Sequence, residues 1–354
     1  MKPQLQRIVT TSLLSKSSRH VLATTSIKRT VIRPKYIPPS KLLGDLQISS
    51  CSFHTSKAAT YSLPTSEEEE EEKEEQKSNF EFIASAAWHP KSPKRQTPSK
   101  KTIDAGEDAF FQTTTPQGLA IGVADGVGGW STMGVDPALF SWTLMNNASN
   151  VASKSSKEDA HDILDVAFDK LRKGGKVSAG SSTACILNLS KTTGEMTSCN
   201  LGDSAFVLVR DKKIVYESPS QQHYFNCPYQ LTVVPRNYPN RDEFVTDLPK
   251  DGDRKTFYLK HGDLILLATD GYFDNVYAEE TLDIINACME SIEDKKSMTK
   301  TLAKTLTEKA RKLSLDPKRI SPWAKAARAQ GANYRGGKVD DITCIVTLVC
   351  HNKI

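Results

Sequence analysis

Acidic residues stand beside several predicted strand ends, where carboxylates could hold divalent cations. Five such places follow one another along the chain: Gly106-Glu107-Asp108, Val123-Ala124-Asp125-Gly126, Asn200-Leu201-Gly202-Asp203-Ser204, Ala268-Thr269-Asp270-Gly271-Tyr272-Phe273-Asp274 and Val339-Asp340-Asp341. Carboxylate oxygens are the ligands that Mg²⁺ and Mn²⁺ prefer, and carboxylates that converge repel one another unless a cation compensates them. A glycine after an aspartate lets the backbone turn closely, so that a carbonyl can also bind. A single Asp-Gly is an ordinary turn, but the ordered set predicts a metal centre.

Short apolar runs rich in Val, Ile and Leu would position these acids, and they have the length of strands. The predicted strands are 119–124, 183–189, 206–209, 264–268 and 343–349. Because strand-like runs come in bursts with helical patterns between them, we expect antiparallel sheets with helices packed outside.

Three helices are predicted from apolar residues at helical spacing, and we expect their apolar stripes to lie in the core. Ser156 with Asp159 forms a capping pair for the first helix, which ends at Gly174 and Gly175. The apolar positions of the three helices are, in turn, Ala160, Ile163, Leu164, Ala167, Phe168 and Leu171; Leu282, Ile285, Cys288, Met289 and Ile292; and Leu302, Leu306, Ala310 and Leu313.

The ordered motifs resemble those of the PPM (type 2C) metal-dependent Ser/Thr protein phosphatases over roughly residues 80–351. The matching motifs are Gly106-Glu107-Asp108-Ala109, Val123-Ala124-Asp125-Gly126-Val127-Gly128-Gly129-Trp130, Ser181-Ser182-Thr183-Ala184, Asn200-Leu201-Gly202-Asp203-Ser204, Leu266-Leu267-Ala268-Thr269-Asp270-Gly271 and Asp340-Asp341-Ile342-Thr343. The variants at 127–130 and 221–226 resemble the mitochondrial branch that fungi and animals share. The resemblance implies an α+β fold of two stacked antiparallel β-sheets flanked by helices, and hydrolysis of phosphoserine and phosphothreonine in proteins.

The resemblance further implies a ligand set for Mn²⁺ or Mg²⁺. Asp125 matches the carboxylate that bridges two metals, and Gly126 the residue whose carbonyl binds. Glu107 matches a ligand of the second metal, and Asp270 and Asp340 complete the first. Two metals that share a hydroxide can attack phosphorus in line without a covalent phosphoenzyme.

Other acids match supporting roles in that family. Asp108 resembles an acid that holds metal-bound water, and Asp341 stands where the family usually has Asn, so we expect it to support the ligands. Asp203 and Asp274, together with Asp270, match a weaker third-metal site seen in parts of the family. Two or three ions are therefore expected.

Two positions depart from the family pattern. Val127 replaces a His thought to protonate the leaving oxygen, and Ile103 replaces an Arg that clamps the phosphate. Metal-bound water or another residue, with His223 as one candidate, would have to replace the acid. Lys100 and Lys101 are candidates for the phosphate charge, without the bidentate geometry of Arg.

These departures keep a second interpretation open, a catalytically weak phosphatase-like scaffold that binds phosphoproteins. The complete metal-ligand set favours an enzyme. Mn²⁺-dependent hydrolysis of an aryl phosphate separates the two, because its good leaving group needs no acid.

The N-terminal segment has the composition of a mitochondrial presequence. Residues 1–44 contain nine Lys/Arg, eleven Ser/Thr and no Asp or Glu; a basic tail that targets nothing is the alternative. We expect a presequence over 1–55, an acidic spacer over 56–79 and a phosphatase domain over 80–354, with linker composition over 85–101. The expected location is the mitochondrial matrix. The resemblance points to phosphorylated mitochondrial proteins, such as enzymes of ubiquinone synthesis, as substrates.

Composition excludes several other classes. The 354 residues carry a net charge of +5, but residues 1–66 hold ten Lys/Arg against one acid, so the basic character gives no reason to expect a nucleic-acid partner. No apolar run reaches the roughly 18 to 20 residues that span a bilayer. Seven scattered cysteines without a C-x-x-C pair argue for a reducing compartment and buried thiols rather than disulfides or zinc. We expect a monomer without a transmembrane segment.

Overall fold

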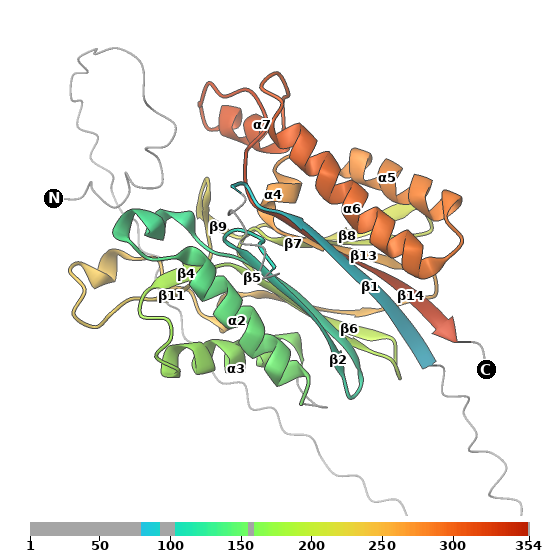
Figure 1. Ribbon diagram of the computed structural model, residues 1–354, viewed down its shortest axis with the longest axis horizontal. Coiled ribbons are helices and arrows are strands. Elements are labelled where there is room, and N and C mark those ends of the chain that lie inside the picture. The colour runs from blue at the N-terminus through green and yellow to red at the C-terminus, as the bar shows by residue number, and fades with distance from the viewer. Residues whose placement is uncertain (1–78, 93–102, 155–158, 353–354) are drawn as a thin grey trace, which may run out of the picture. The chain divides into compact units, whose positions relative to one another are not determined.

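The computed structural model describes residues 79–92, 103–154 and 159–352 (Figure 1). Several predicted features lie outside the described residues: the presequence, residues 56–78 of the spacer, residues 93–101 of the linker, Ser156, Lys100 and Lys101. Asn79, the last residue of the predicted spacer, begins a strand instead. None of the helices in the described part of the chain combines the length and apolar character that a membrane span requires.

Two five-stranded sheets form the centre of the fold, and neighbouring strands in both are antiparallel. The first sheet has the order β1 (Asn79–His89), β14 (Ile342–Asn352), β13 (Leu264–Ala268), β7 (Ala205–Arg210) and β8 (Lys213–Glu217). The second has the order β12 (Asp253–Tyr258), β6 (Glu195–Leu201), β5 (Ala184–Ser190), β3 (Gly118–Asp125) and β2 (Asp108–Thr115).

Helices and short strands complete the described part. The main helices are α2 (Pro137–Ala152), α3 (Ala160–Lys173), α5 (Ala278–Ser291) and α6 (Lys295–Ser314). The shorter elements are η1 (Gly128–Met133), β4 (Gly180–Ser182), β9 (Gln222–Tyr224), β10 (Cys227–Pro228), β11 (Leu231–Val233), η2 (Arg241–Glu243), η3 (Pro249–Asp251), α4 (Asp270–Phe273) and α7 (Pro322–Ala329).

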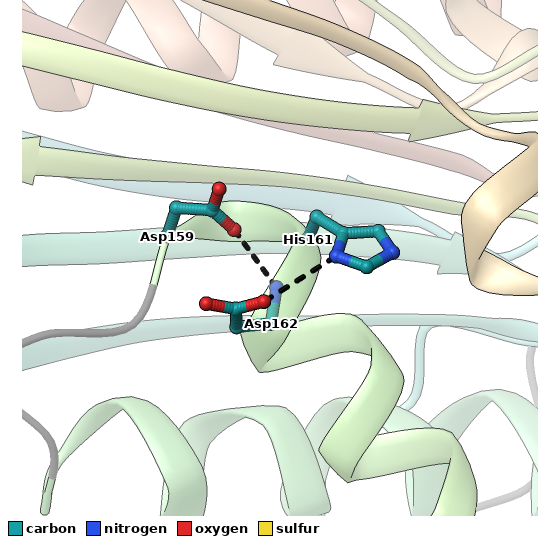
Figure 2. A group of neighbouring side chains, drawn as sticks. All are labelled: Asp159, His161 and Asp162. Carbon is teal, nitrogen blue, oxygen red and sulfur yellow. Dashed lines mark hydrogen bonds and ion pairs between the residues drawn. The ribbon is translucent and has the colours of Figure 1, made fainter.

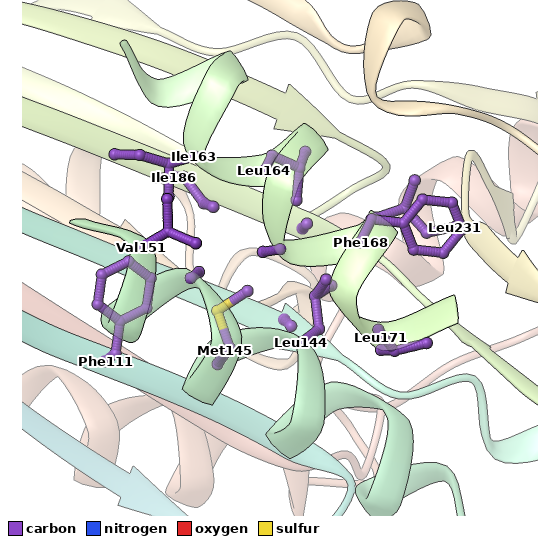
Figure 3. Packing of buried hydrophobic residues seen from close by; sticks show 14 of the residues in the cluster. Phe111, Leu144, Met145, Val151, Ile163, Leu164, Phe168, Leu171, Ile186 and Leu231 are labelled. Atoms are coloured by element: carbon purple, nitrogen blue, oxygen red, sulfur yellow. The ribbon is translucent and has the colours of Figure 1, made fainter. Parts of the chain in front are cut away.

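Three apolar layers hold these elements together. Alternate strand residues, such as Ile121 and Leu187 from one sheet and Leu267 and Ile345 from the other, fill the space between the sheets. Residues of α2 and α3 pack on the outer face of the β2–β3–β5–β6 sheet, where Figure 3 shows Leu144, Met145, Ile163, Phe168 and their neighbours. Helices α5 and α6 cover the outer face of the other sheet. The predicted fold of two stacked antiparallel sheets flanked by helices is confirmed.

The predicted strands correspond to β3, β5, β7, β13 and β14, and the predicted helices to α3, α5 and α6. Asp159 is the N-cap of α3 and accepts a hydrogen bond from the Asp162 N–H. The core assignment of Met289 is wrong, because α5 buries a narrow stripe centred on Ile285 and leaves Met289 37% exposed. Ile292 follows α5 as its C-cap and packs against the core from outside the helix.

The linker predicted over 85–101 is wrong for its first residues. Residues 85–89 are the second half of β1, where Ser85 pairs with Val346 and His89 with Ile342. Phe82 and Ala86 face the core between the sheets, while Ile83 and Ala87 face α6. This alternation makes β1 an edge strand with both faces covered, despite the Pro- and Lys-rich sequence that follows it.

Candidate metal centre

The predicted acids converge because their strands begin or end at one end of the two sheets. In one sheet Asp108 starts β2 and pairs directly with Asp125, the last residue of β3. In the other sheet Asp270 follows β13, and Asp340 and Asp341 precede the neighbouring β14. Adjacent antiparallel strands run in opposite directions, so a strand end lies beside a strand start. The fold therefore brings together acids that are more than 200 positions apart in the sequence.

Asp108 joins the two sheets at this end. Its Oδ2 accepts hydrogen bonds from the hydroxyls of Thr269, at 2.9 Å, and Thr343, at 2.8 Å. Thr343 lies in β14 of the opposite sheet, and Thr269 directly follows β13 of that sheet. The Asp108 side chain is buried, and its Oδ1 has no hydrogen-bond partner among the described residues. Burial, and next the charge of Asp341, raise the pKa of the Asp108 carboxyl. Oδ2 of Asp108 is thus held by two hydroxyl groups, whereas Oδ1 remains able to accept a further hydrogen bond.

Asp125 and Asp270 form the most crowded part of the cluster. Burial and then the charges of Asp270, Asp108 and Asp340 raise the pKa of Asp125 well above its usual range. Asp270 has a buried Oδ1 that no described residue hydrogen-bonds. Unpaired buried carboxylate oxygens that face other carboxylates are unfavourable without a cation. The residues therefore fit divalent cations.

The Ser181-Ser182-Thr183-Ala184 motif positions the Asp125 backbone. The Thr183 hydroxyl accepts from the Asp125 N–H at 3.1 Å, and the Thr183 N–H donates to the Asp125 carbonyl at 3.0 Å. The Ser182 hydroxyl donates to the same carbonyl at 2.8 Å. Gly126 follows in a space where a Cβ atom would lie 2.6 Å from the Pro137 carbonyl oxygen. A side chain at this position would clash with backbone atoms, so the close packing here favours glycine.

Asp341 supports Glu107, as expected. Its Oδ2 accepts from the Glu107 N–H at 3.0 Å, and its Oδ1 accepts from the Lys91 N–H at 2.7 Å. The Glu107 carbonyl accepts from Ser141 of α2 at 2.6 Å. A Cβ atom on Gly128 would lie 2.8 Å from Glu107 Oε2, so this glycine leaves room for the carboxylate.

Lys91 and Lys338 also enter the cluster, and the sequence analysis missed both. Lys91 Nζ lies 2.6 Å from Glu107, 3.2 Å from Asp340 and 3.3 Å from Asp341. Lys338 Nζ lies 2.5 Å from Asp270, 2.6 Å from Asp274 and 3.3 Å from Asp340. The only sequence signal for Lys338 is its place two residues before the Asp340-Asp341 pair.

The two ammonium groups act on the pKa values of two neighbouring acids, Asp340 and Asp274. Burial alone would lower the pKa of Lys91 and of Lys338, but the surrounding carboxylates raise both. Burial raises the pKa of Asp274 to about 7 even though Lys338 opposes the shift. For Asp340 the lysines outweigh burial: burial acts to raise its pKa, but Lys338 and Lys91 together lower it. Lys338 and Lys91 therefore favour the ionised form of Asp340.

Asp203 lies at the edge of the cluster. It follows β6 through Gly202, whose φ of +111° favours glycine. Its Oδ2 accepts from the Gln222 side-chain amide at 3.2 Å, which connects it to the β9–β10 hairpin. Burial, and then Asp270, raise the pKa of Asp203. Asp203, Asp270 and Asp274 thus lie close enough to act on one another electrostatically, and Lys338 acts on all three.

His223, the described candidate for the missing acid, gains no support; Lys100 and Lys101 lie outside the described residues. His223 Nε2 lies 2.9 Å from Asp247, and its ring stacks on Tyr229 at 4.2 Å between centroids, which favours a structural role. Val127 packs against the cluster around Trp130, and Ile103 is 51% exposed.

The described cysteines are free; all but the half-buried Cys288 are buried, as expected for core thiols.

A second group of possible ligands lies at the start of α3, where Figure 2 shows Asp159, His161 and Asp162. Asp159 caps the helix by accepting from the Asp162 N–H at 2.9 Å, and His161 Nδ1 lies 3.4 Å from Asp162 Oδ1. The two acids are exposed, so helix capping explains this group.

Comparisons with known proteins agree with the geometry. Residues 101–307 match the family model described as "Protein phosphatase 2C". The chain is 40% identical over 274 residues to the 5-azacytidine resistance protein azr1 of Schizosaccharomyces pombe, which covers 75% of this chain and 91% of that one. It is 38% identical over 257 residues to the protein phosphatase PTC7 homolog of Homo sapiens, covering 71% and 81% respectively. The X-ray structure of the photosystem II phosphatase PBCP superposes with a TM-score of 0.60 at 30% identity, covering 75% of this chain and 98% of the other.

Proposed function

The chain belongs to the protein phosphatase 2C family, whose members are serine/threonine phosphatases that use Mn²⁺ or Mg²⁺. We propose that it hydrolyses phosphoserine and phosphothreonine esters at the carboxylate cluster. The observation that carries this proposal is the pair of buried oxygens, Asp108 Oδ1 and Asp270 Oδ1, that lack a partner among the described residues inside a set of mutually repelling acids. Such an arrangement is stabilised when divalent cations are bound.

We assign two cations to these residues. Asp125, Asp270 and Asp340 would hold one, and Glu107, Asp125 and the carbonyl of Gly126 the other. When bound, such a pair of cations polarises the phosphoryl oxygens and activates water for in-line attack.

The chain itself supplies orientation around the cations. Thr269 and Thr343 fix one oxygen of Asp108, so its other oxygen can accept a hydrogen bond from the attacking water. Asp341 holds the backbone at Glu107 and so sets the direction of that carboxylate. These groups act as preorganised hydrogen-bond partners and do not form covalent bonds to phosphorus.

Substitution of Asp125 tests this function. Asp125→Asn keeps the size of the side chain but removes the bridging charge, so Mn²⁺ binding and aryl phosphate hydrolysis should both be lost at saturating Mn²⁺. Asp283→Asn, the same change at an exposed position on α5, is the matched control. Activity of Asp125→Asn within threefold of the unmodified protein would exclude the two-cation assignment. Normal Mn²⁺ binding with no aryl phosphate hydrolysis by the unmodified protein would favour the phosphoprotein-binding scaffold.

We further propose that the protein acts as a monomer in the mitochondrial matrix on phosphorylated mitochondrial proteins. The acid-free, basic and Ser/Thr-rich composition of residues 1–44 supports the compartment. Enzymes of ubiquinone synthesis are the first substrates to examine, on the basis of the family branch that the sequence resembles. Substrate trapping with Asp125→Asn in isolated mitochondria tests the proposed substrates. If the proteins captured by the variant include no phosphorylated matrix proteins, the proposal is contradicted.

A further inference from the structure

Lys338 lies where a third cation would be expected. Its ammonium contacts Asp270 at 2.5 Å and Asp274 at 2.6 Å, and the charge of Asp203 also acts on it. These three acids are the residues predicted to form a weaker third-metal site. An ammonium offers three hydrogen-bond donors and one positive charge, so it can replace a cation at two carboxylates.

The backbone around Lys338 is built to hold this position. The buried Asn275, next to Asp274, accepts from the Lys338 N–H at 2.9 Å and donates to the Lys338 carbonyl at 2.8 Å. Asn275 also donates to the Gly271 carbonyl at 2.9 Å, which ties this clamp to α4. The Lys338 side chain is only 19% exposed. Its placement is therefore fixed at both the backbone and the ammonium.

The oxygens of Asp270 are divided between two partners. Lys338 contacts Oδ2, whereas Oδ1 is the buried oxygen without a partner that remains for a metal ion. Asp274 likewise directs its Oδ2 to Lys338. A divalent ion between Asp203, Asp270 and Asp274 would have to displace the ammonium or lie beside it against charge repulsion.

We propose that Lys338 is a built-in cation that takes the place of the third metal ion, so that this phosphatase binds two divalent ions per chain. This inference rests on the proposed metal-dependent function. It makes Lys338 a positioning residue that holds Asp270 and Asp274 without a diffusible ion. Turnover should then reach its maximum once two ions are bound, with no further rise at millimolar Mn²⁺.

Counting bound Mn²⁺ tests the proposal directly. The electron paramagnetic resonance signal of free Mn²⁺ reports how many ions each full-length chain binds over a titration into the millimolar range. We expect two ions for the unmodified protein and for Lys338→Arg, and three for Lys338→Met, whose third site no longer holds an ammonium group that repels the ion. Adding Asp274→Asn to Lys338→Met should return the number to two. Lys300→Met removes an exposed lysine of α6 and is the matched control.

The outcomes separate this inference from the function on which it rests. Three ions in the unmodified protein, or two in Lys338→Met, would overturn the role of Lys338 and leave the phosphatase assignment intact. No bound ion in the unmodified protein would refute the metal centre itself and this inference with it. If Lys338→Met does not fold, as judged by circular dichroism, Lys338→Gln takes its place under the same criteria.

Discussion

The substitution Gly106→Ala probes how tightly the backbone before Glu107 is held against Asp341. Gly106 has a φ of +73°, and a Cβ atom there would lie 1.9 Å from Asp341 Oδ1 and 2.7 Å from Oδ2. The buried Asp341 cannot move freely, since its two oxygens accept from the Lys91 and Glu107 N–H groups. The new methyl group must therefore break at least part of this arrangement.

The expected loss has two parts. The left-handed conformation costs an alanine about 1 kcal/mol relative to glycine. Each hydrogen bond to a charged group that Asp341 gives up costs about 1.5 to 3 kcal/mol more. We expect Gly106→Ala to lower the free energy of unfolding by about 4 to 7 kcal/mol if both bonds are lost.

Gly134→Ala provides the control for this measurement. Gly134 has nearly the same φ, +74°, but a Cβ atom there meets nothing within 4 Å. Gly134→Ala should lower the free energy of unfolding only by the cost of the left-handed conformation, about 1 kcal/mol. Urea denaturation of the two variants in EDTA gives the difference between their free energies of unfolding, provided that both show the same dependence of that free energy on urea concentration. If the two variants agree within about 0.5 kcal/mol, the contact between Gly106 and Asp341 does not hold the site as described.

Three further predictions concern stability, chemistry and targeting. Arg210→Ala should destabilise the protein by about 3 kcal/mol in urea denaturation, because Arg210 pairs bidentately at 2.7 and 2.6 Å with the buried Asp263; a loss below about 1 kcal/mol would contradict this. Since Val127 cannot protonate the leaving oxygen, rates across substituted phenyl phosphates should fall steeply as leaving-group pKa rises, and Val127→His should flatten that slope. A shallow slope in the unmodified enzyme would show that another group already acts as the acid. Residues 1–50 should carry a fluorescent passenger into mitochondria, and a cytosolic passenger would argue against a presequence.

Strands that carry their own local signal could be predicted from the sequence. β13 is a continuous apolar run, buried along its whole length and followed closely by Asp270 and Gly271, and β5 is apolar and buried over residues 184–187. Helix α2 gave no such signal, because it buries residues around much of its circumference and so lacks a clear polar face. The second half of β1 was hidden by its small residues and by the Pro- and Lys-rich stretch beside it. Its strand character depends on pairing with β14, which is distant in the sequence.

The candidate site likewise contains residues that the sequence could predict and residues that it could not. Asp108 begins β2, Asp125 ends β3, and Asp270 and Asp340 lie two residues from β13 and β14, so the convergence of these acids follows once the strands are known to be antiparallel neighbours. Lys91 and Lys338 reach the cluster through the end of β1 and the segment before β14, and nothing local distinguishes them from exposed lysines. Their contacts depend on tertiary structure and could not be read from spacing.

The aspartate at position 341, where the resembling family usually has asparagine, has a structural reason here. Its two oxygens face two backbone donors, the N–H of Glu107 and the N–H of Lys91. An asparagine has one acceptor oxygen, and its amide nitrogen would turn a donor toward one of these N–H groups. Lys91, two residues after the end of β1, supplies the second donor, so a carboxylate at 341 and a lysine at 91 belong to one arrangement that fixes Glu107 from both sides.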